Sequence, residues 1–263
     1  MKYRFSRKQL AIPYALFLLV FVAAPLVVIV YYALTGSDGT PTADNFIRFF
    51  SDPNTLGTLL YSLILALVTT CVCLLIAYPV AYALAFSRLK ASSVLVMLFI
   101  MPMWINFTLR LTALKEILTL IEGNLAFHPF LNSVIGMTYD FLPFMILPIY
   151  NQLERLDKSL LEAAKDLGAG DAQSFIKVTL PLSMPGVVSG IAMVFLPAMT
   201  NYVVLDMLYN STYIMGSLIG SYFAAYDWHG GSMISLILLA LICIFTLLTK
   251  SDEGQKTRGG SLV

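Results

Sequence analysis

Long stretches without a charged residue alternate with short charged segments along this 263-residue chain. A helix that crosses the hydrocarbon core of a membrane needs about 20 mostly apolar residues. Most of the uncharged stretches are long and apolar enough for such a crossing. They predict membrane-spanning helices at about 12–34, 58–86, 92–109, 132–150, 183–205 and 231–249.

The composition supports this interpretation. Hydrophobic residues make up 59% of the chain and charged residues 12%, and the mean hydropathy is +0.82. An average soluble domain has about 25% charged residues, so a soluble enzyme is excluded. The net charge of +1 provides no basic surface for a nucleic acid. We therefore expect an all-α integral membrane protein with the lipid bilayer as its surroundings and no nucleic acid as partner.

The basic residues predict the orientation of the spans, because they concentrate on the cytoplasmic side of a membrane. With six spans, 13 of the 16 Lys and Arg residues fall on one side, and only Arg48, Arg110 and Lys115 on the other. Both termini should then be cytoplasmic. The uncharged stretch 207–226 is rich in polar and small residues. A seventh crossing there would spoil this asymmetry, so we interpret it as a short amphipathic or re-entrant segment.

The longest predicted cytoplasmic connection, residues 151–181, has an amphipathic pattern. Apolar residues recur at three- and four-residue intervals and predict one helical face. Asp157 and Ser159 compete as the N-cap, Gly168 stands where a left-handed turn would end the helix, and Asp171 starts a second short helix. A solvated hairpin is one interpretation, but an apolar stripe favours a docking surface. The residues of the stripe are Leu153, Leu156, Leu160, Ala164 and Leu167.

Residues in this connection resemble the EAA signature of the membrane subunits of ABC importers. The match consists of Glu162-Ala163-Ala164, then Gly168, then Val178-x-Leu180-Pro181, with Val178 where that family usually has Ile. The resemblance implies a coupling helix that binds a cytoplasmic ATPase subunit. Ala163 and Ala164 would allow close approach, Glu162 would accept a hydrogen bond from a basic partner, and Gly168 would permit the sharp turn.

Further segments are similar to the spermidine/putrescine importer permeases of the PotB type, from about residue 55 to 249. The resemblance implies the type I importer architecture, with six transmembrane helices, in a bacterial cytoplasmic membrane. It also implies three partners: an ABC ATPase dimer, a second homologous permease that usually differs from the first, and an extracellular or periplasmic polyamine-binding protein. The segments are Met101–Asn106, Leu142–Pro148, Leu156–Lys158, Pro181–Gly186 and Asp227–Trp228.

This interpretation divides the chain into three parts. Residues 1–57 form a basic segment, the first span and an external loop. Residues 58–249 form the core permease domain with five spans and the coupling loop 151–181. Residues 250–263, which include several glycines, form a flexible cytoplasmic tail.

Nothing in the sequence predicts catalysis by this chain. It has no Gly-x4-Gly-Lys-Ser/Thr segment for ATP and no arrangement of a nucleophile with a base. We expect no cofactor in this chain, with ATP and Mg bound by the partner ATPase. The three cysteines and two histidines show no metal-ligand spacing, so we expect small packing residues and surface groups. They are Cys71, Cys73, Cys243, His128 and His229.

A path for a polyamine needs carboxylates for its ammonium groups and aromatic faces for its methylene stretches. Asp206 ends the fifth predicted span, and Tyr202 precedes it by one turn on the same helix face, with Met199 one turn below. We expect this pair to contact cargo. The alternative is an interfacial tyrosine with an aspartate among the lipid headgroups.

Other residues of the predicted path are less specific. Asp140 lies in the fourth span, where an ionisable group is functional by default. It either contacts cargo, or it is kept neutral or hydrogen-bonded to the backbone that Pro143 frees. Trp104 and Asn106 are candidate lining residues near the outer end of the third span. Arg110, with Lys115 and Glu116, is expected in a solvated rim.

The predicted function is therefore alternating access, in which ATPase closure shifts the 151–181 unit as a lever and the third to fifth spans rock. Prolines within or near these spans permit the kinks that this motion needs. An importer permease of the same fold for iron, thiamine or an oxyanion remains the alternative, although the core spans lack the basic groups that an anion would need. A non-transport assembly or sensor subunit is the more distant alternative.

Overall fold

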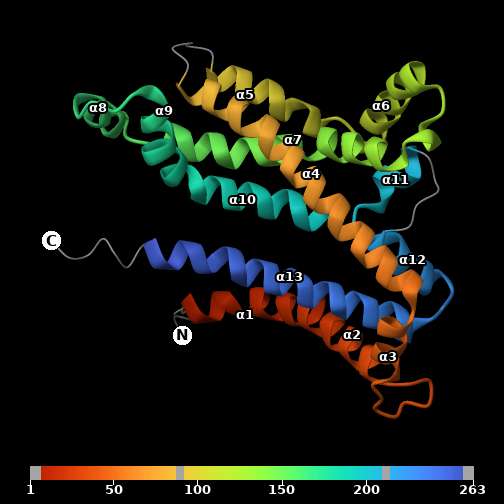
Figure 1. Ribbon diagram of the computed structural model, residues 1–263. Coiled ribbons are helices and arrows are strands. Elements are labelled where there is room, and N and C mark those ends of the chain that lie inside the picture. Colours follow the sequence, from red (N-terminus) through yellow and green to blue (C-terminus); the bar gives the residue numbers. More distant parts are fainter. Residues whose placement is uncertain (1–6, 87–91, 209–213, 257–263) are drawn as a thin grey trace, which may run out of the picture. The chain divides into compact units, whose positions relative to one another are not determined.

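The computed structural model describes residues 7–86, 92–208 and 214–256, and these residues are folded almost entirely as helices (Figure 1). Within these ranges, five helices are long and apolar enough to cross a membrane, or six if one bent pair counts as a span. The all-α membrane fold is thereby confirmed. The five are Ile12–Leu34, Pro53–Phe86, Pro129–Glu154, Asp171–Ala198 and Trp228–Leu247.

The chain divides into two units by its internal contacts. One unit consists of residues 1–57 and 217–243, and the other of residues 58–216 and 244–263. The first unit contains the span made of α1 (Arg7–Leu18), a π-helical stretch (Leu19–Ala23) and α2 (Ala24–Leu34), followed by α3 (Asp44–Ser51). It also contains the start of α4 (Pro53–Phe86), most of α12 (Met215–Ala224) and the first half of α13 (Trp228–Lys256).

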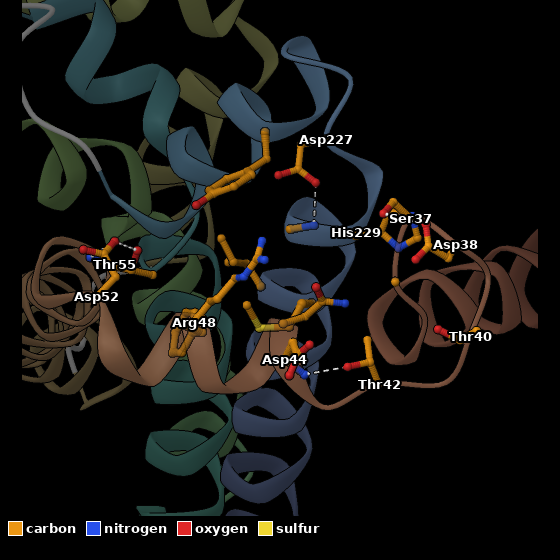
Figure 2. Close-up of a pocket in the computed structure, with 17 residues that line it drawn as sticks. Ser37, Asp38, Thr40, Thr42, Asp44, Arg48, Asp52, Thr55, Asp227 and His229 are labelled. Atoms are coloured by element: carbon orange, nitrogen blue, oxygen red, sulfur yellow. Dashed lines mark hydrogen bonds between the residues drawn. The ribbon is translucent and has the colours of Figure 1, made fainter.

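A polar cavity of about 440 Å³ lies in this first unit (Figure 2). Its lining includes Asp38, Asp44, Asp52 and Asp227. Asp52 accepts hydrogen bonds from the backbone N–H groups at the start of α4, Asp227 accepts one from Gly230 N at 2.9 Å, and Asp44 begins α3. Asp52 and Asp227 therefore cap helix starts, and Asp44 lies in the first turn of α3, where a negative charge is favourable.

The second unit is built on α7 (Pro129–Glu154) and α10 (Leu180–Ala198), which lie side by side (Figure 1). Two glycines of α10 bring the backbones together. A Cβ atom on Gly186 would lie 2.7 Å from Pro148 O, and one on Gly190 would lie 2.6 Å from Met145 Sδ. Small residues at such contacts are typical of membrane helices, because packing rather than the hydrophobic effect drives their association.

The third predicted span is broken, so the prediction of one helix over 92–109 was wrong. α5 (Ser92–Ile100) continues as a 3₁₀ turn to Trp104, and α6 (Phe107–Glu122) then leaves at an angle of 97°. Pro102 lies in the 3₁₀ turn, and the Asn106 side chain accepts a hydrogen bond from Thr108 N at 2.9 Å. The new N-cap starts a separate helix at the point where the first one ends.

The fifth predicted span also differs from its prediction over 183–205. It begins earlier, because α9 (Asp171–Ser174), a π-helical stretch (Phe175–Thr179) and α10 form one helix to Ala198. It ends earlier, because Met199–Asn201 interrupt the helix before α11 (Tyr202–Leu208). Of the predicted segment 207–226, residues 209–213 lie outside the described residues. α12 follows with 10 residues, too few to cross a membrane.

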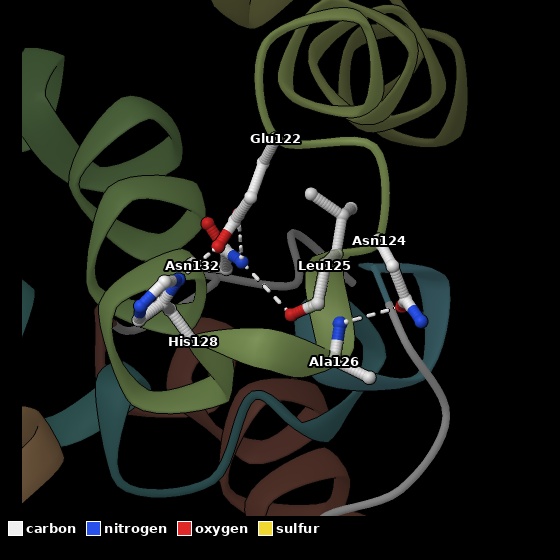
Figure 3. A network of polar contacts seen from close by, with 6 residues as sticks. All are labelled: Glu122, Asn124, Leu125, Ala126, His128 and Asn132. Carbon is white, nitrogen blue, oxygen red and sulfur yellow. Dashed lines mark hydrogen bonds and ion pairs between the residues drawn. The ribbon is translucent and has the colours of Figure 1, made fainter.

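The turn from α6 to α7 is held by a polar network (Figure 3). Glu122, the last residue of α6, contacts His128 and accepts a hydrogen bond from Asn132 Nδ2 at 2.7 Å. Asn132 also donates to Leu125 O at 2.9 Å.

At the other end of the chain, α13 continues to Lys256. Residues 250–256 of the predicted tail are thus helical, and residues 257–263 lie outside the described residues.

Candidate functional site: coupling hairpin and cargo path

The predicted coupling loop is a helical hairpin between α7 and α10. α7 ends at Glu154, and α8 (Lys158–Asp166) follows after three residues. Because of this interruption, the prediction of one apolar face from Leu153 to Leu167 was wrong. Leu153 is buried at the end of α7, Leu160 on α8 is 47% exposed, and Leu167 beyond α8 is 89% exposed. The exposed large apolar side chains of the hairpin therefore lie on α8, in the turn that follows it and, at Ile176, in the π-helical stretch after α9.

The end of α8 has the geometry that the sequence predicted. Gly168 has a φ of +85°, in the left-handed region that favours glycine. Its N–H donates to Lys165 O at 2.9 Å, and Ala169 N–H donates to Ala164 O at 3.0 Å. These two bonds form a Schellman motif, which satisfies the last carbonyls of the helix. The chain then reverses into α9.

The start of α8 is capped by Asp157, whose carboxylate accepts a hydrogen bond from Ser159 N at 2.9 Å. This bond lowers the pKa of Asp157 below its ordinary value of 3.8. Since the folded-state pKa is the lower one, the cap stabilises α8 above the unfolded-state pKa. Its contribution is lost as the pH falls through the folded-state pKa.

We therefore expect Asp157→Ala to reduce the protection of α8 amides from hydrogen exchange roughly threefold to tenfold at neutral pH, because the first N–H groups lose their acceptor. Asp157→Asn keeps an acceptor and should retain most of the protection, without the loss on acidification that the native protein shows. Protection factors corrected for intrinsic exchange at pH 7 and near pH 3 measure this. Equal protection in all three proteins would contradict it.

The residues of the EAA signature are distributed over the whole hairpin. Glu162 and Ala163 are exposed and Ala164 is half-buried on α8, while Leu180 and Pro181 open α10. Lys165 Nζ lies 2.9 Å from Asp171 Oδ1, which links α8 to α9 and raises the pKa of Lys165. The side chains that the signature places on α8 thus remain free for a partner.

The base of the hairpin is attached to α4 by residues that the sequence analysis missed. The Tyr78 hydroxyl lies 2.9 Å from Ser183 Oγ, and the rings of Tyr78 and Tyr82 lie edge-on to Phe175 with centroids 5.8 and 5.5 Å away. Tyr78 and Tyr82 are four residues apart in the half of α4 nearest this hairpin. This four-residue spacing places both tyrosines on one face of the helix, and it could have indicated a contact surface in the sequence.

The predicted cargo pair lies on α11 rather than at the end of a span. Tyr202 and Asp206 are four residues apart in this helix and both are exposed, so they share a face as expected. Met199 does not lie on the same helix, because it is buried in the interruption before α11. The opposite face of α11 is buried and packs against α6 and α7; it consists of Val204, Leu205 and Leu208.

The two lining candidates stand at the break of the third span. Trp104 is largely exposed at the end of the 3₁₀ turn. Asn106 is exposed as well, and its side chain caps α6. A capping function accounts for Asn106 locally, whereas no contact within the described residues accounts for the position of Trp104.

Asp140 is paired with a residue that we expected elsewhere. Arg110 Nη2 donates to Asp140 Oδ1 at 2.8 Å, and each side chain is 8% exposed. The expectation that Arg110 belongs to a solvated rim was therefore wrong. The bend of 97° after Trp104 explains the difference, because it turns α6 back onto α7. Tertiary structure of this kind leaves no signal in the local sequence.

Comparisons with known proteins agree on the family. The family model described as "Binding-protein-dependent transport system inner membrane component" matches residues 9–251. The spermidine/putrescine transport system permease protein PotB of Escherichia coli is 36% identical over 225 residues, covering 79% of this chain and 81% of that protein. The PotB protein of Haemophilus influenzae is 34% identical over 263 residues, covering 92% and 91%.

Solved structures support the fold. A chain of a bacterial alginate ABC transporter, crystallised with an alginate-bound periplasmic protein, superposes with a TM-score of 0.73 and 12% identity over 92% of this chain and 91% of its own length. A second structure of a bacterial alginate importer gives a TM-score of 0.67 and 13% identity. The chain belongs to the family of binding-protein-dependent transport system inner membrane components.

Proposed function

We propose that this chain is the permease subunit of an ATP-driven importer of polyamines such as spermidine and putrescine. An external binding protein delivers the cargo, and a cytoplasmic ABC ATPase dimer, which binds ATP and Mg, drives its passage. The chain itself is not an enzyme. It pairs with a second, homologous permease of different sequence in the cytoplasmic membrane of a bacterium. Both termini of this chain lie on the cytoplasmic side.

The hairpin 151–181 is the observation that carries this proposal. It joins α7 to α10, two helices that pack closely in the second unit, and it presents the exposed side of α8 with Glu162 and Ala163. A partner that moves the hairpin therefore moves both helices together. The ends of a hairpin built on packed helices cannot shift independently, since close-packed interfaces transmit strain.

The cargo assignment is supported by two kinds of observation. Relatives that are 34–37% identical over most of the chain are named as spermidine/putrescine permeases. An exposed carboxylate and an exposed aromatic ring on one face of α11 also fit a cation with methylene spacers. Asp206 would bind an ammonium group, and Tyr202 the neighbouring cation face or alkyl stretch. Trp104 is the further candidate along this path.

Uptake by the assembled importer tests the cargo. The chain is co-expressed with its ATPase, second permease and binding protein in cells that lack other polyamine importers, and uptake of labelled spermidine and putrescine is measured. We expect saturable uptake that excess sulfate, ferric iron or thiamine does not inhibit. Uptake of one of these competitors in place of polyamines would refute the cargo assignment.

Removing the charge of Asp206 should weaken cargo binding more than turnover. We expect Asp206→Asn to raise the KM for spermidine about tenfold, as for loss of one charge-assisted contact of about 1.4 kcal/mol. Tyr202→Leu should raise the KM about threefold. Glu116→Gln, which removes an exposed charge from α6, is the matched control and should leave the KM unchanged. An unchanged KM in Asp206→Asn would exclude this carboxylate from the path.

A further inference from the structure

The ion pair between Arg110 and Asp140 is the least expected feature of the second unit. Both side chains are 8% exposed, and the Arg110 Nη2 to Asp140 Oδ1 distance is 2.8 Å. Asp140 lies in the middle of α7, while Arg110 lies at the fourth position of α6. Burying two charges is costly even when they are paired. A pair in this place therefore calls for a function.

Among the described residues, the carboxylate of Asp140 is the only hydrogen-bond partner of the Arg110 guanidinium group. Its Nε and Nη1 atoms are buried and have no hydrogen-bond partner among the described residues. An arginine does not lose its charge in a protein, whereas a carboxylate can take up a proton. Without Asp140, the buried cation would have no acceptor in the second unit as described, and α6 could not remain in place without leaving that cation buried and unpaired.

The position of α6 in turn determines the surroundings of α11. The inner side of α6 is marked by Leu111, which is 0% exposed, and its outer side by Leu120, which is 86% exposed. α11 packs against both α6 and α7, and a Cβ atom on Gly136 of α7 would lie 2.7 Å from Leu208 of α11. A shift of α6 therefore removes one of the two supports of the helix that carries Tyr202 and Asp206.

We propose that Arg110 and Asp140 are a positioning pair, which fixes α6 on α7 and so seats α11, and that Asp140 does not bind cargo. The pair has no net charge to offer a polyamine. The Asp140 charge is already balanced by Arg110, and the side chain is 8% exposed, so a cargo ammonium group would have to be buried to reach a carboxylate that has no net charge left to offer. The transport part of this inference rests on the proposed function, but the positioning part does not.

Two interpretations of Asp140 predict opposite results for a pair of neutral substitutions. If Asp140 positions α6, then Asp140→Asn alone leaves the buried Arg110 cation without a counter-charge, although the amide oxygen can still accept a hydrogen bond, and the double variant Arg110→Gln with Asp140→Asn removes that cation. If Asp140 binds cargo, the single and the double variant are equally defective, because both lack the carboxylate. Arg110→Gln alone should be milder than Asp140→Asn, since the remaining carboxyl group can become neutral by protonation.

Thiol labelling measures the position of α6 without any transport assay. In a background that lacks the native cysteines, Leu111→Cys is introduced and its reaction with a water-soluble maleimide is followed in the purified full-length protein. We expect Asp140→Asn to accelerate labelling at least about tenfold and the double variant to return it to within about threefold of the native pair. Leu120→Cys, on the exposed side, serves as the control and should label equally fast in every variant.

Transport completes the test in the assembled importer. We expect Asp140→Asn to lower the maximal rate of polyamine uptake about tenfold or more, and the double variant to recover most of it with a KM near the native value. Slow labelling at position 111 in Asp140→Asn, or a double variant as defective as the single one, would overturn the proposal. A different outcome separates the two proposals. If the double variant regains slow labelling at position 111 but the native importer takes up no polyamine, the proposed cargo is refuted and the positioning pair stands.

Discussion

Replacement of Gly168 by valine is expected to reduce coupled transport at least about tenfold. The φ of +85° lies in the left-handed region, where a β-branched residue costs roughly 1–2 kcal/mol or more. No atom lies within 4 Å of a Cβ added there, so the effect comes from the backbone alone and not from a clash. Loss of the Schellman motif would turn α8 away from α9 and so displace Glu162 and Ala163 from the surface that we propose binds the ATPase.

The matched control is Gly168→Asn, because asparagine tolerates the left-handed conformation far better than valine does. We expect cargo-stimulated ATP hydrolysis and uptake to fall at least about tenfold in the valine variant and no more than about threefold in the asparagine variant. Hydrolysis and uptake are measured in reconstituted vesicles that contain the complete importer. Full activity of the valine variant would remove the hairpin from the coupling mechanism.

Gly186→Ala is expected to destabilise the protein more than an alanine substitution at any other glycine discussed above. The added Cβ atom would lie 2.7 Å from Pro148 O and 3.2 Å from Ile149 Cα, which are backbone atoms of α7. Neither can rotate away, so α7 and α10 must move apart. Overpacking of this kind costs about 1–3 kcal/mol, and here it also loosens the contact through which the hairpin moves both helices.

Gly220→Ala provides the control, since no atom lies within 4 Å of a Cβ added there and the residue also belongs to a helix. Thermal unfolding in detergent should show a melting temperature lowered by several degrees for Gly186→Ala and unchanged or slightly raised for Gly220→Ala, because alanine favours a helix by about 1 kcal/mol over glycine. Equal melting temperatures would mean that α7 and α10 are less tightly packed than the distances indicate.

Much of the fold could be predicted from the sequence because its signals are local. Uncharged stretches of sufficient length identify spans, and the cap at Asp157 and the turn at Gly168 depend on residues a few positions away. The interruptions could not be predicted in the same way. Residues 105–106 and 199–201 lie in apolar surroundings, so hydropathy continues across a break that capping and proline residues produce.

The candidate site divides along the same line. The α8 residues of the signature and the shared face of Tyr202 and Asp206 follow from spacing within one helix. The pairing of Asp140 with Arg110, 30 residues away, follows from the bend after Trp104, and the attachment of Tyr78 to Ser183 spans 105 residues. Contacts at that separation depend on how helices pack against one another. The spacing of residues within one helix does not indicate that packing.

The unbroken helix from Asp171 to Ala198 has a mechanical consequence. Its 28 residues make a rod about 42 Å long at about 1.5 Å per residue, and the first break in the helix after the hairpin end is the gap at 199–201. A rod of that length amplifies a slight tilt at its base into a stroke of several ångströms at its tip. The tip ends at the gap 199–201, so the stroke reaches α11 and Tyr202 across that joint.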